Sequence, residues 1–92
     1  MRQYRFSPRF EHAYAGLPRR IANLFDKKLP LFLNNPYHTS FLSRKMEEVK
    51  NPDIWKARLT IHYRWTFHVA EDGALIFRNI GTHDILKRPT SS

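Results

Sequence analysis

The sequence predicts one α+β domain with the element order β-α-α-β-β-β, in which an antiparallel-rich sheet carries a two-helix hairpin on one face. Two segments with apolar residues at helical spacing follow a short N-terminal strand. A stretch in the second half alternates apolar and cationic residues with period two. The length of 92 residues leaves room for one modest core, so we expect residues 1–92 to form a single domain.

The first helix has sequence signals at both ends. After an expected strand over residues 3–6, Ser7 has the form of an N-cap and Pro8 suits the first helical position. Apolar residues recur from Phe10 to Leu17 with the spacing of one helix face, and Gly16 can end the helix. We therefore expect a short helix directly after the first strand.

A second helix is expected to begin at Pro18 and to fold back on the first. Apolar residues keep helical spacing from Ile21 to Leu33, and basic residues occupy the expected solvent-exposed positions between them. Pro30 lies inside this pattern and has no amide hydrogen to donate to the carbonyl of Asp26, so we expect a kink or a break there. The tight join between the helices predicts an antiparallel hairpin.

Three strands are expected in the second half of the chain, at about residues 55–61, 63–69 and 74–80. Residues 71–73, Glu-Asp-Gly, turn the second of these strands into the third. No Gly or Pro marks the join between the first two strands, which leaves their register open. Residues 51–53, Asn-Pro-Asp, indicate a turn before the first strand, and residues 41–49 hold either a short strand or an irregular segment.

The period-two pattern divides the expected sheet into two faces. The apolar face would cover the helix hairpin and consists of Trp55, Ala57, Leu59, Tyr63, Trp65, Phe67 and Val69. The other face is cationic and carries Lys56, Arg58, Arg64, His68 and Arg78, with His83 just past its end. Because the helices cover only one face, the cationic face stays open to a ligand.

The charge balance favours a polyanionic partner. Sixteen Lys and Arg residues against eight Asp and Glu residues give a formal net charge of +8, which predicts binding to nucleic acid or to an acidic protein. A merely soluble basic surface is the alternative. The absence of cysteine excludes disulfides and thiolate metal sites, and it fits a reducing cytoplasm. We expect neither a signal peptide nor a membrane partner, because no apolar run has the required length.

An ordered set of motifs resembles the RelE/ParE superfamily of bacterial toxin–antitoxin toxins. Residues 36–42, Pro-Tyr-His-Thr-Ser-Phe-Leu, look like that family's Asn-Pro-x-His-Pro-Ser-Leu segment after the second helix. Residues 55–58, Trp-Lys-Ala-Arg, and residues 63–64, Tyr-Arg, look like its aromatic-x-x-Arg and Tyr-Arg strand pair. Residues 81–84, Gly-Thr-His-Asp, match an ending common in one branch. The resemblance covers nearly the whole chain.

This resemblance implies an mRNA endonuclease that acts on the ribosome and is silenced by a cognate antitoxin, expected to be acidic, across the basic face. Functional basic residues of the RelE branch occupy positions that match Lys56, Arg58, Arg64 and His83 here. The RelE branch has Arg at the position of His83, whereas other RNase branches use His. It also has a functional Tyr a few residues later, where residues 87–89 of this chain are Lys-Arg-Pro.

Metal-free RNA cleavage needs a base for the 2′-hydroxyl, positive charge on the phosphorane and an acid for the 5′-oxygen. Arg58 and Arg64 suit the second task, because a planar guanidinium pairs with two phosphate oxygens. His83 is the candidate general acid, because imidazole titrates near neutral pH. Lys56 is either the base or a phosphate contact. We expect no cofactor and no metal, since the histidines show no recurring zinc-ligand spacing.

Further basic residues are candidate contacts to RNA: Arg78 and His68 on the cationic face, and Arg19, Arg20, Lys27 and Lys28 on the second helix. Each has a structural alternative. The four helix residues can be a solvated helix face, and His68 can be a structural or surface group. Arg58 and Arg64 can form an ordinary strand face with cross-strand pairs, and residues 81–84 can be only a helix cap.

Two other functions remain open beside the nuclease. A ParE-like toxin would bind DNA gyrase and cut no RNA, and a degenerate toxin would act only by binding other proteins. One fold serves all of these functions, so the fold alone cannot separate them. The placement of Arg58, Arg64 and His83 on or beside one face favours the nuclease.

Overall fold

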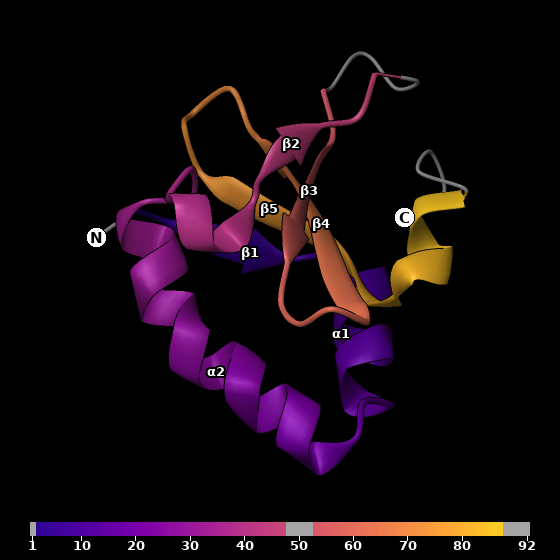
Figure 1. Cartoon of the computed structure of the whole chain (residues 1–92). Helices are drawn as coiled ribbons and strands as arrows, with labels where there is room; N and C mark the ends of the chain where they lie inside the picture. Colours follow the sequence, from indigo (N-terminus) through magenta and orange to yellow (C-terminus); the bar gives the residue numbers. More distant parts are fainter. Residues whose placement is uncertain (1, 48–52, 88–92) are drawn as a thin grey trace.

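A five-stranded sheet with two helices on one face makes up the protein (Figure 1). The computed structural model describes residues 2–47 and 53–87. In chain order its elements are β1 (Tyr4–Phe6), α1 (Pro8–Ala15), α2 (Arg19–Asn34), the 3-10 helix η1 (Thr39–Phe41), β2 (Arg44–Lys45), β3 (Trp55–Arg58), β4 (Tyr63–Val69), β5 (Leu75–Thr82) and the 3-10 helix η2 (His83–Lys87). The predicted α+β class is confirmed.

The strand order in the sheet is β1-β5-β4-β3-β2. Strand β1 is parallel to β5, and all other neighbours are antiparallel. The two-residue strand β2 falls within the segment for which the sequence left a strand or an irregular chain open, and it adds an edge strand beyond the predicted order. The turn expected over residues 51–53 lies mostly outside the described residues.

Helix α1 begins and ends where the sequence predicts. The Ser7 side chain accepts a hydrogen bond from the amide of Phe10, Pro8 occupies the first turn, and Gly16 follows the last helical residue. The Ser7 hydroxyl also donates to the carbonyl of Arg78 on β5 over 2.8 Å. The cap therefore stabilises α1 and ties its start to the sheet.

Helix α2 runs through Pro30 without a break, so of the predicted kink or break the break does not occur. Proline removes one backbone hydrogen bond, to the carbonyl of Asp26, but Asp26 and Pro30 both lie on the exposed side of the helix. Water can take the place of the missing donor at such a position. Buried residues of α2 from Ile21 to Leu33 belong to the core cluster, and this packing holds the helix together.

Aromatic rings join both helices to the same face of the sheet. The ring of Phe10 on α1 lies 5.5 Å from Phe77, and Phe25 on α2 lies 5.8 Å from the same ring. Phe32, farther along α2, lies 4.9 Å from Trp65 on β4. All five of these side chains are buried in one cluster, which confirms that the helix pair covers the apolar face.

Strand β3 ends at Arg58, three residues before the predicted end. The amide of Leu59 donates to the carbonyl of Tyr63, and the Thr60 hydroxyl accepts the amides of His62 and Tyr63. The threonine side chain thus supplies the turn that no Gly or Pro marks in the sequence. Ile61 at its tip is 66% exposed.

The turn between β4 and β5 forms as predicted. Gly73 has a φ of 87°, which favours glycine, and Asp72 accepts the amide of Ala74. Strand β5 continues to Thr82, two residues beyond the predicted end. Val69, the last residue of β4, is 38% exposed, so it does not cover the helices as the alternation predicted.

Candidate functional site

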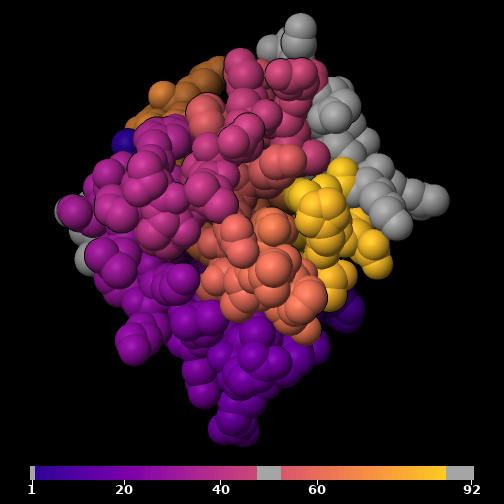
Figure 2. Space-filling view, in the orientation of Figure 1, coloured from indigo at the N-terminus to yellow at the C-terminus, as the bar shows by residue number. Residues whose placement is uncertain are grey.

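The four residues predicted to act on RNA line one cavity on the open face of the sheet. This cavity measures about 190 Å³ and is lined by Leu42, Arg44, Lys56, Ala57, Arg58, Arg64, His83 and Leu86. In Figure 2 the segments that contribute to it, around β2, the β3–β4 turn and η2, meet on the face toward the reader. Cationic side chains from three strands and the imidazole of His83 therefore converge on one hollow.

Strand register brings these side chains together. Arg44 lies opposite Lys56, and Arg58 lies opposite Arg64, so both pairs point to the same face. Arg64 in turn lies opposite Gly81 on β5, two residues before His83. The cavity is thus built from paired positions on β2, β3, β4 and the end of β5.

Gly81 lets η2 fold back close to the sheet. A Cβ atom at this position would lie 2.9 Å from Cγ2 of Ile85, closer than such atoms normally approach. The glycine therefore permits the tight passage from β5 into η2, which begins at His83. This passage sets the imidazole at the cavity wall.

Hydrogen bonds hold the guanidinium of Arg64 at the cavity. Its Nη1 donates to the carbonyl of Tyr63 over 3.0 Å and also to the carbonyl of Thr60 in the β3–β4 turn. Burial lowers the pKa of Arg64 from its ordinary value, and the positive charge of Arg58 lowers it further. An arginine under these conditions stays charged, but an anion bound between the two guanidinium groups would be strongly favoured.

Two residues of the site were missed from the sequence, Arg44 and Glu47. A second cavity of about 340 Å³ adjoins the first and is lined by Arg44, Lys45, Met46, Glu47, Lys56, His83 and Leu86. It places a carboxylate at the same cavity as the imidazole of His83. Neither residue follows a strand or helix pattern, and the short charged run around residues 44–48 is the only sequence signal.

Arg78 and His68 share the open face but lie outside both cavities. Arg78 Nη1 lies 3.0 Å from His68 Nδ1, and because arginine only donates, the histidine nitrogen accepts. Burial lowers the pKa of His68, and the charges of Arg78 and Arg5 lower it further. Burial also lowers the pKa of Arg78, whose Nε has no hydrogen-bond partner among the described residues. The contact between Arg78 and His68 and their partial burial are typical of a structural role.

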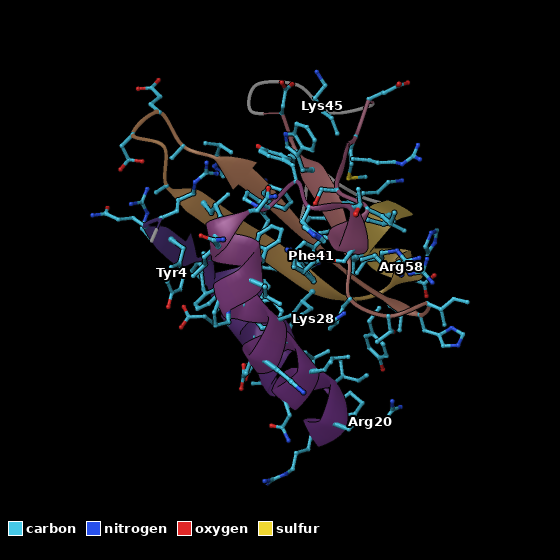
Figure 3. All side chains as sticks on the ribbon, turned by 60° about the vertical axis from the view of Figure 1, so that its left-hand side comes forward. Tyr4, Arg20, Lys28, Phe41, Lys45 and Arg58 are labelled. Carbon is cyan, nitrogen blue, oxygen red and sulfur yellow. The ribbon has the colours of Figure 1, made fainter. Side chains whose placement is uncertain are left out.

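The basic residues of α2 belong to the helix side of the molecule. Arg19, Arg20 and Lys27 are exposed, and Lys28 Nζ donates to the carbonyl of Leu59 over 3.5 Å. Figure 3 shows Arg20 near the start of α2, well away from Arg58. The structure does not bring these four residues to the cavities that contain His83.

Within residues 2–47 and 53–87, no group of three or more His, Cys, Asp or Glu side chains could hold a metal ion. None of the helices in that part of the chain has both the length and the apolar character needed to cross a membrane.

Solved structures of toxin–antitoxin proteins share this fold, although the sequence matches no protein-family model and no curated protein. The RelE–RelB complex of the archaeon Pyrococcus horikoshii OT3 aligns with a TM-score of 0.71 at 19% identity, over 88% of this chain and 93% of that chain. YafQ from E. coli strain BL21(DE3) gives 0.73 at 17% identity, over 94% and 98%. The intact E. coli RelBE toxin–antitoxin complex gives 0.69 at 20% identity, over 89% and 96%. The chain therefore has the RelE-like toxin fold that its motifs resemble.

Proposed function

We propose that this protein is the toxin of a toxin–antitoxin module and cuts mRNA on the ribosome. The observation that carries the proposal is the cavity in which Lys56, Arg58, Arg64 and His83 converge. Positive charge and a titratable imidazole at one hollow are what cleavage of a phosphodiester requires. The RelE-like fold supports the same conclusion, because the E. coli RelBE neighbour is a toxin–antitoxin complex and the P. horikoshii neighbour is a RelE–RelB complex.

The cleavage would proceed by attack of the 2′-hydroxyl on the adjacent phosphorus. The O2′–P bond forms, the P–O5′ bond breaks, and the products are a 2′,3′-cyclic phosphate and a 5′-hydroxyl end. Arg58 and Arg64 would pair with the phosphate oxygens, on which negative charge increases in the transition state. The two guanidinium groups lie on directly opposed residues, so one phosphate can contact both. No metal ion is required in this mechanism.

Glu47 and His83 are our candidates for the two proton transfers. A carboxylate is ionised at neutral pH and can accept the 2′-hydroxyl proton, while a protonated imidazole can donate to the leaving 5′-oxygen. Both residues line the larger of the two adjoining cavities. Lys56 lines the smaller cavity together with Arg58 and Arg64, so we assign it to phosphate binding. Glu47 and His83 would together take the role of the functional Tyr of the RelE branch, which this chain lacks at residues 87–89.

The same cationic surface would be the target of the antitoxin. An acidic antitoxin that covers the open face would neutralise Arg58 and Arg64 and would exclude mRNA from the cavity. Binding of the antitoxin should weaken as the salt concentration rises, because salt screens the attraction between exposed charges. The screening length is about 8 Å at physiological ionic strength.

Inhibition of DNA gyrase is the alternative, and one neighbour with this fold carries ParE in its name. The YoeB/ParE toxin from Agrobacterium tumefaciens aligns with a TM-score of 0.70 at 13% identity, over 90% of this chain and 99% of that chain. Convergence of Glu47, Arg58, Arg64 and His83 on adjoining cavities favours RNA chemistry over gyrase binding.

The deciding experiment gives the purified protein to programmed ribosomes with end-labelled mRNA and, in parallel, to DNA gyrase in a supercoiling assay. We expect mRNA fragments that end in a 2′,3′-cyclic phosphate, and unchanged supercoiling. Loss of supercoiling without RNA fragments would establish the ParE-like alternative. Inactivity in both assays, with retained binding to the antitoxin, would identify a degenerate toxin.

A further inference from the structure

A separate cavity lies on the helix side of the sheet and has no residue in common with the cationic cavities. It measures about 350 Å³ and is lined by Phe6 of β1, by Phe10, Glu11 and Tyr14 of α1, and by Phe25, Asp26 and Leu29 of α2. Phe10 and Phe25 are buried, whereas Glu11 and Asp26 are exposed. The cavity therefore has an aromatic floor and a rim with two carboxylates.

The aromatic floor is held in place by ring contacts. Phe6 stacks on Phe10 with ring centroids 5.0 Å apart, and Phe10 lies 5.4 Å from Phe25. Tyr14 lies 6.1 Å from Phe25 and completes the wall on the α1 side. Aromatic faces within about 6 Å of a cation attract it through their negative electrostatic potential. Such a floor suits the aliphatic stem and the charged head of a long basic side chain.

One carboxylate of the rim is fixed in position. The Tyr14 hydroxyl donates to Asp26 Oδ1 over 2.6 Å, and this bond is the main reason that the pKa of Tyr14 lies above its ordinary value. Within the described ranges the salt bridges join Arg5 to Asp72 and Lys45 to Asp53, so neither Glu11 nor Asp26 is paired with a Lys or Arg there. Two carboxylates without a basic partner stand out on a chain of net charge +8.

We propose that this cavity binds an arginine or lysine side chain presented by a partner polypeptide. Its apolar walls would contact the methylene groups, and Glu11 and Asp26 would bind the cationic head. The net positive charge of the chain weakens the binding of a free small cation, so such a cation should bind less tightly than a basic side chain carried by a polypeptide. A partner with acidic residues elsewhere is attracted by that charge and presents its basic side chain at high effective concentration. The inference does not depend on the proposed nuclease function.

The test uses the whole protein and two matched probes. N-acetyl-arginine methylamide and its neutral counterpart N-acetyl-citrulline methylamide are titrated while the ring resonances of Phe10, Tyr14 and Phe25 are followed by NMR. We expect saturable shifts with the arginine probe and at least about fivefold weaker binding of the citrulline probe, because only the former carries the charge. A capped Leu-Arg-Leu peptide should bind more tightly than the single residue and more tightly than spermidine.

Carboxamide variants test the rim. Asp26→Asn should weaken binding of the arginine probe at least about threefold, whereas Asp53→Asn, the same charge change at the Lys45 salt bridge, should leave binding unchanged. Amide spectra of both variants show whether the fold is retained. Equal binding of the two probes, or no saturable shift with either the arginine probe or the peptide, would overturn the proposal. Spermidine binding at least as tightly as the peptide would overturn the assignment to a polypeptide.

Discussion

Arg58 and Arg64 lie directly opposite each other on β3 and β4, an arrangement that lowers stability in the absence of an anion. Arg64 is partly buried and its pKa is lowered in part by Arg58, which shows that the two charges interact. Proteins keep such unfavourable contacts where function requires them. At the scale of single residues, the site is therefore expected to trade stability for anion binding.

Replacing Arg58 separates these two effects. Arg58→Gln should raise the free energy of unfolding by about 0.2–1 kcal/mol, because the cross-strand repulsion is lost. The same change should lower the rate of mRNA cleavage at least about tenfold, because one phosphate contact is lost. Urea unfolding and single-turnover cleavage measure the two quantities. Arg9→Gln on the exposed side of α1 is the control with the same change in net charge, and it should alter neither. A destabilised Arg58→Gln variant would contradict the repulsion argument.

His68 should make stability depend on pH. Its pKa in the folded protein lies below the ordinary value of 6.5, because of burial and the charges of Arg78 and Arg5. The unfolded chain therefore takes up this proton at higher pH than the folded protein does. The contribution of His68 to stability should be constant above about pH 7 and should be lost as the pH decreases from about 6.5 toward the folded-state pKa.

The matching variant is His68→Gln, whose amide oxygen can still accept from Arg78 but does not titrate. Urea unfolding at several pH values between about 5 and 8 should show a smaller loss of stability at low pH for the variant than for the wild type. The other histidines are common to both proteins and cancel in the comparison. Identical pH profiles would show that His68 does not carry the effect.

Among the elements, α1 is tied to β5 by the hydroxyl of Ser7 in addition to the packing of Phe10 on Phe77. Ser7→Ala should lower the free energy of unfolding by about 1–2 kcal/mol, because it removes both the helix cap and the hydrogen bond to the Arg78 carbonyl. Ser7→Thr keeps both groups and should cost less than about 0.5 kcal/mol. Thermal or urea unfolding of the two variants checks this, and equal losses would contradict the role assigned to the hydroxyl.

Local signals made most elements predictable from the sequence. The cap at Ser7, the glycine at position 16 and the turn at Gly73 act over a few residues, and the structure confirms all three. The end of β3 was not predictable, because Thr60 makes its turn with a side-chain hydroxyl and not with Gly or Pro. The continuity of α2 depends on packing of its apolar face, which outweighs the loss of one hydrogen bond at Pro30.

The candidate site was predictable where its residues follow the strand alternation. Lys56, Arg58 and Arg64 alternate with buried residues, so their common face was visible in the sequence, and the motif resemblance pointed to His83. Arg44 lies in a strand of two residues that forms only by pairing with β3. Glu47 follows that strand without any pattern. Tertiary pairing, which no local pattern encodes, brings these two residues to the cavities.

At the scale of the whole molecule, charge is divided between the two sides of the sheet. The open side carries the cationic cavities, and the helix side carries an aromatic cavity with two acidic residues. A polyanion should therefore bind one side, although basic residues are present on both. We therefore expect the basic residues of the cationic cavities to contribute to RNA binding and those of α2 not to contribute.

Salt dependence of binding to single-stranded RNA measures that distribution. If the four cations of the smaller cavity each contact one phosphate, raising salt from about 50 to 200 mM should weaken binding about 50-fold. Arg44→Gln should reduce the slope of log affinity against log salt by about 0.7, because it removes one contact. Arg19→Gln on α2 should leave the slope unchanged. An equal reduction by Arg19→Gln would place RNA on the helix side as well.

Single-turnover cleavage of mRNA on programmed ribosomes by site variants tests the central claim most directly, since the claim is that the cavity around His83 is catalytic. His83→Ala and Arg64→Ala should each lower the cleavage rate at least about tenfold, with amide spectra that show a retained fold. Arg20→Ala, at the start of α2, should cleave at the wild-type rate. Full cleavage by both the His83→Ala and the Arg64→Ala proteins would contradict the assignment of this cavity as the active site.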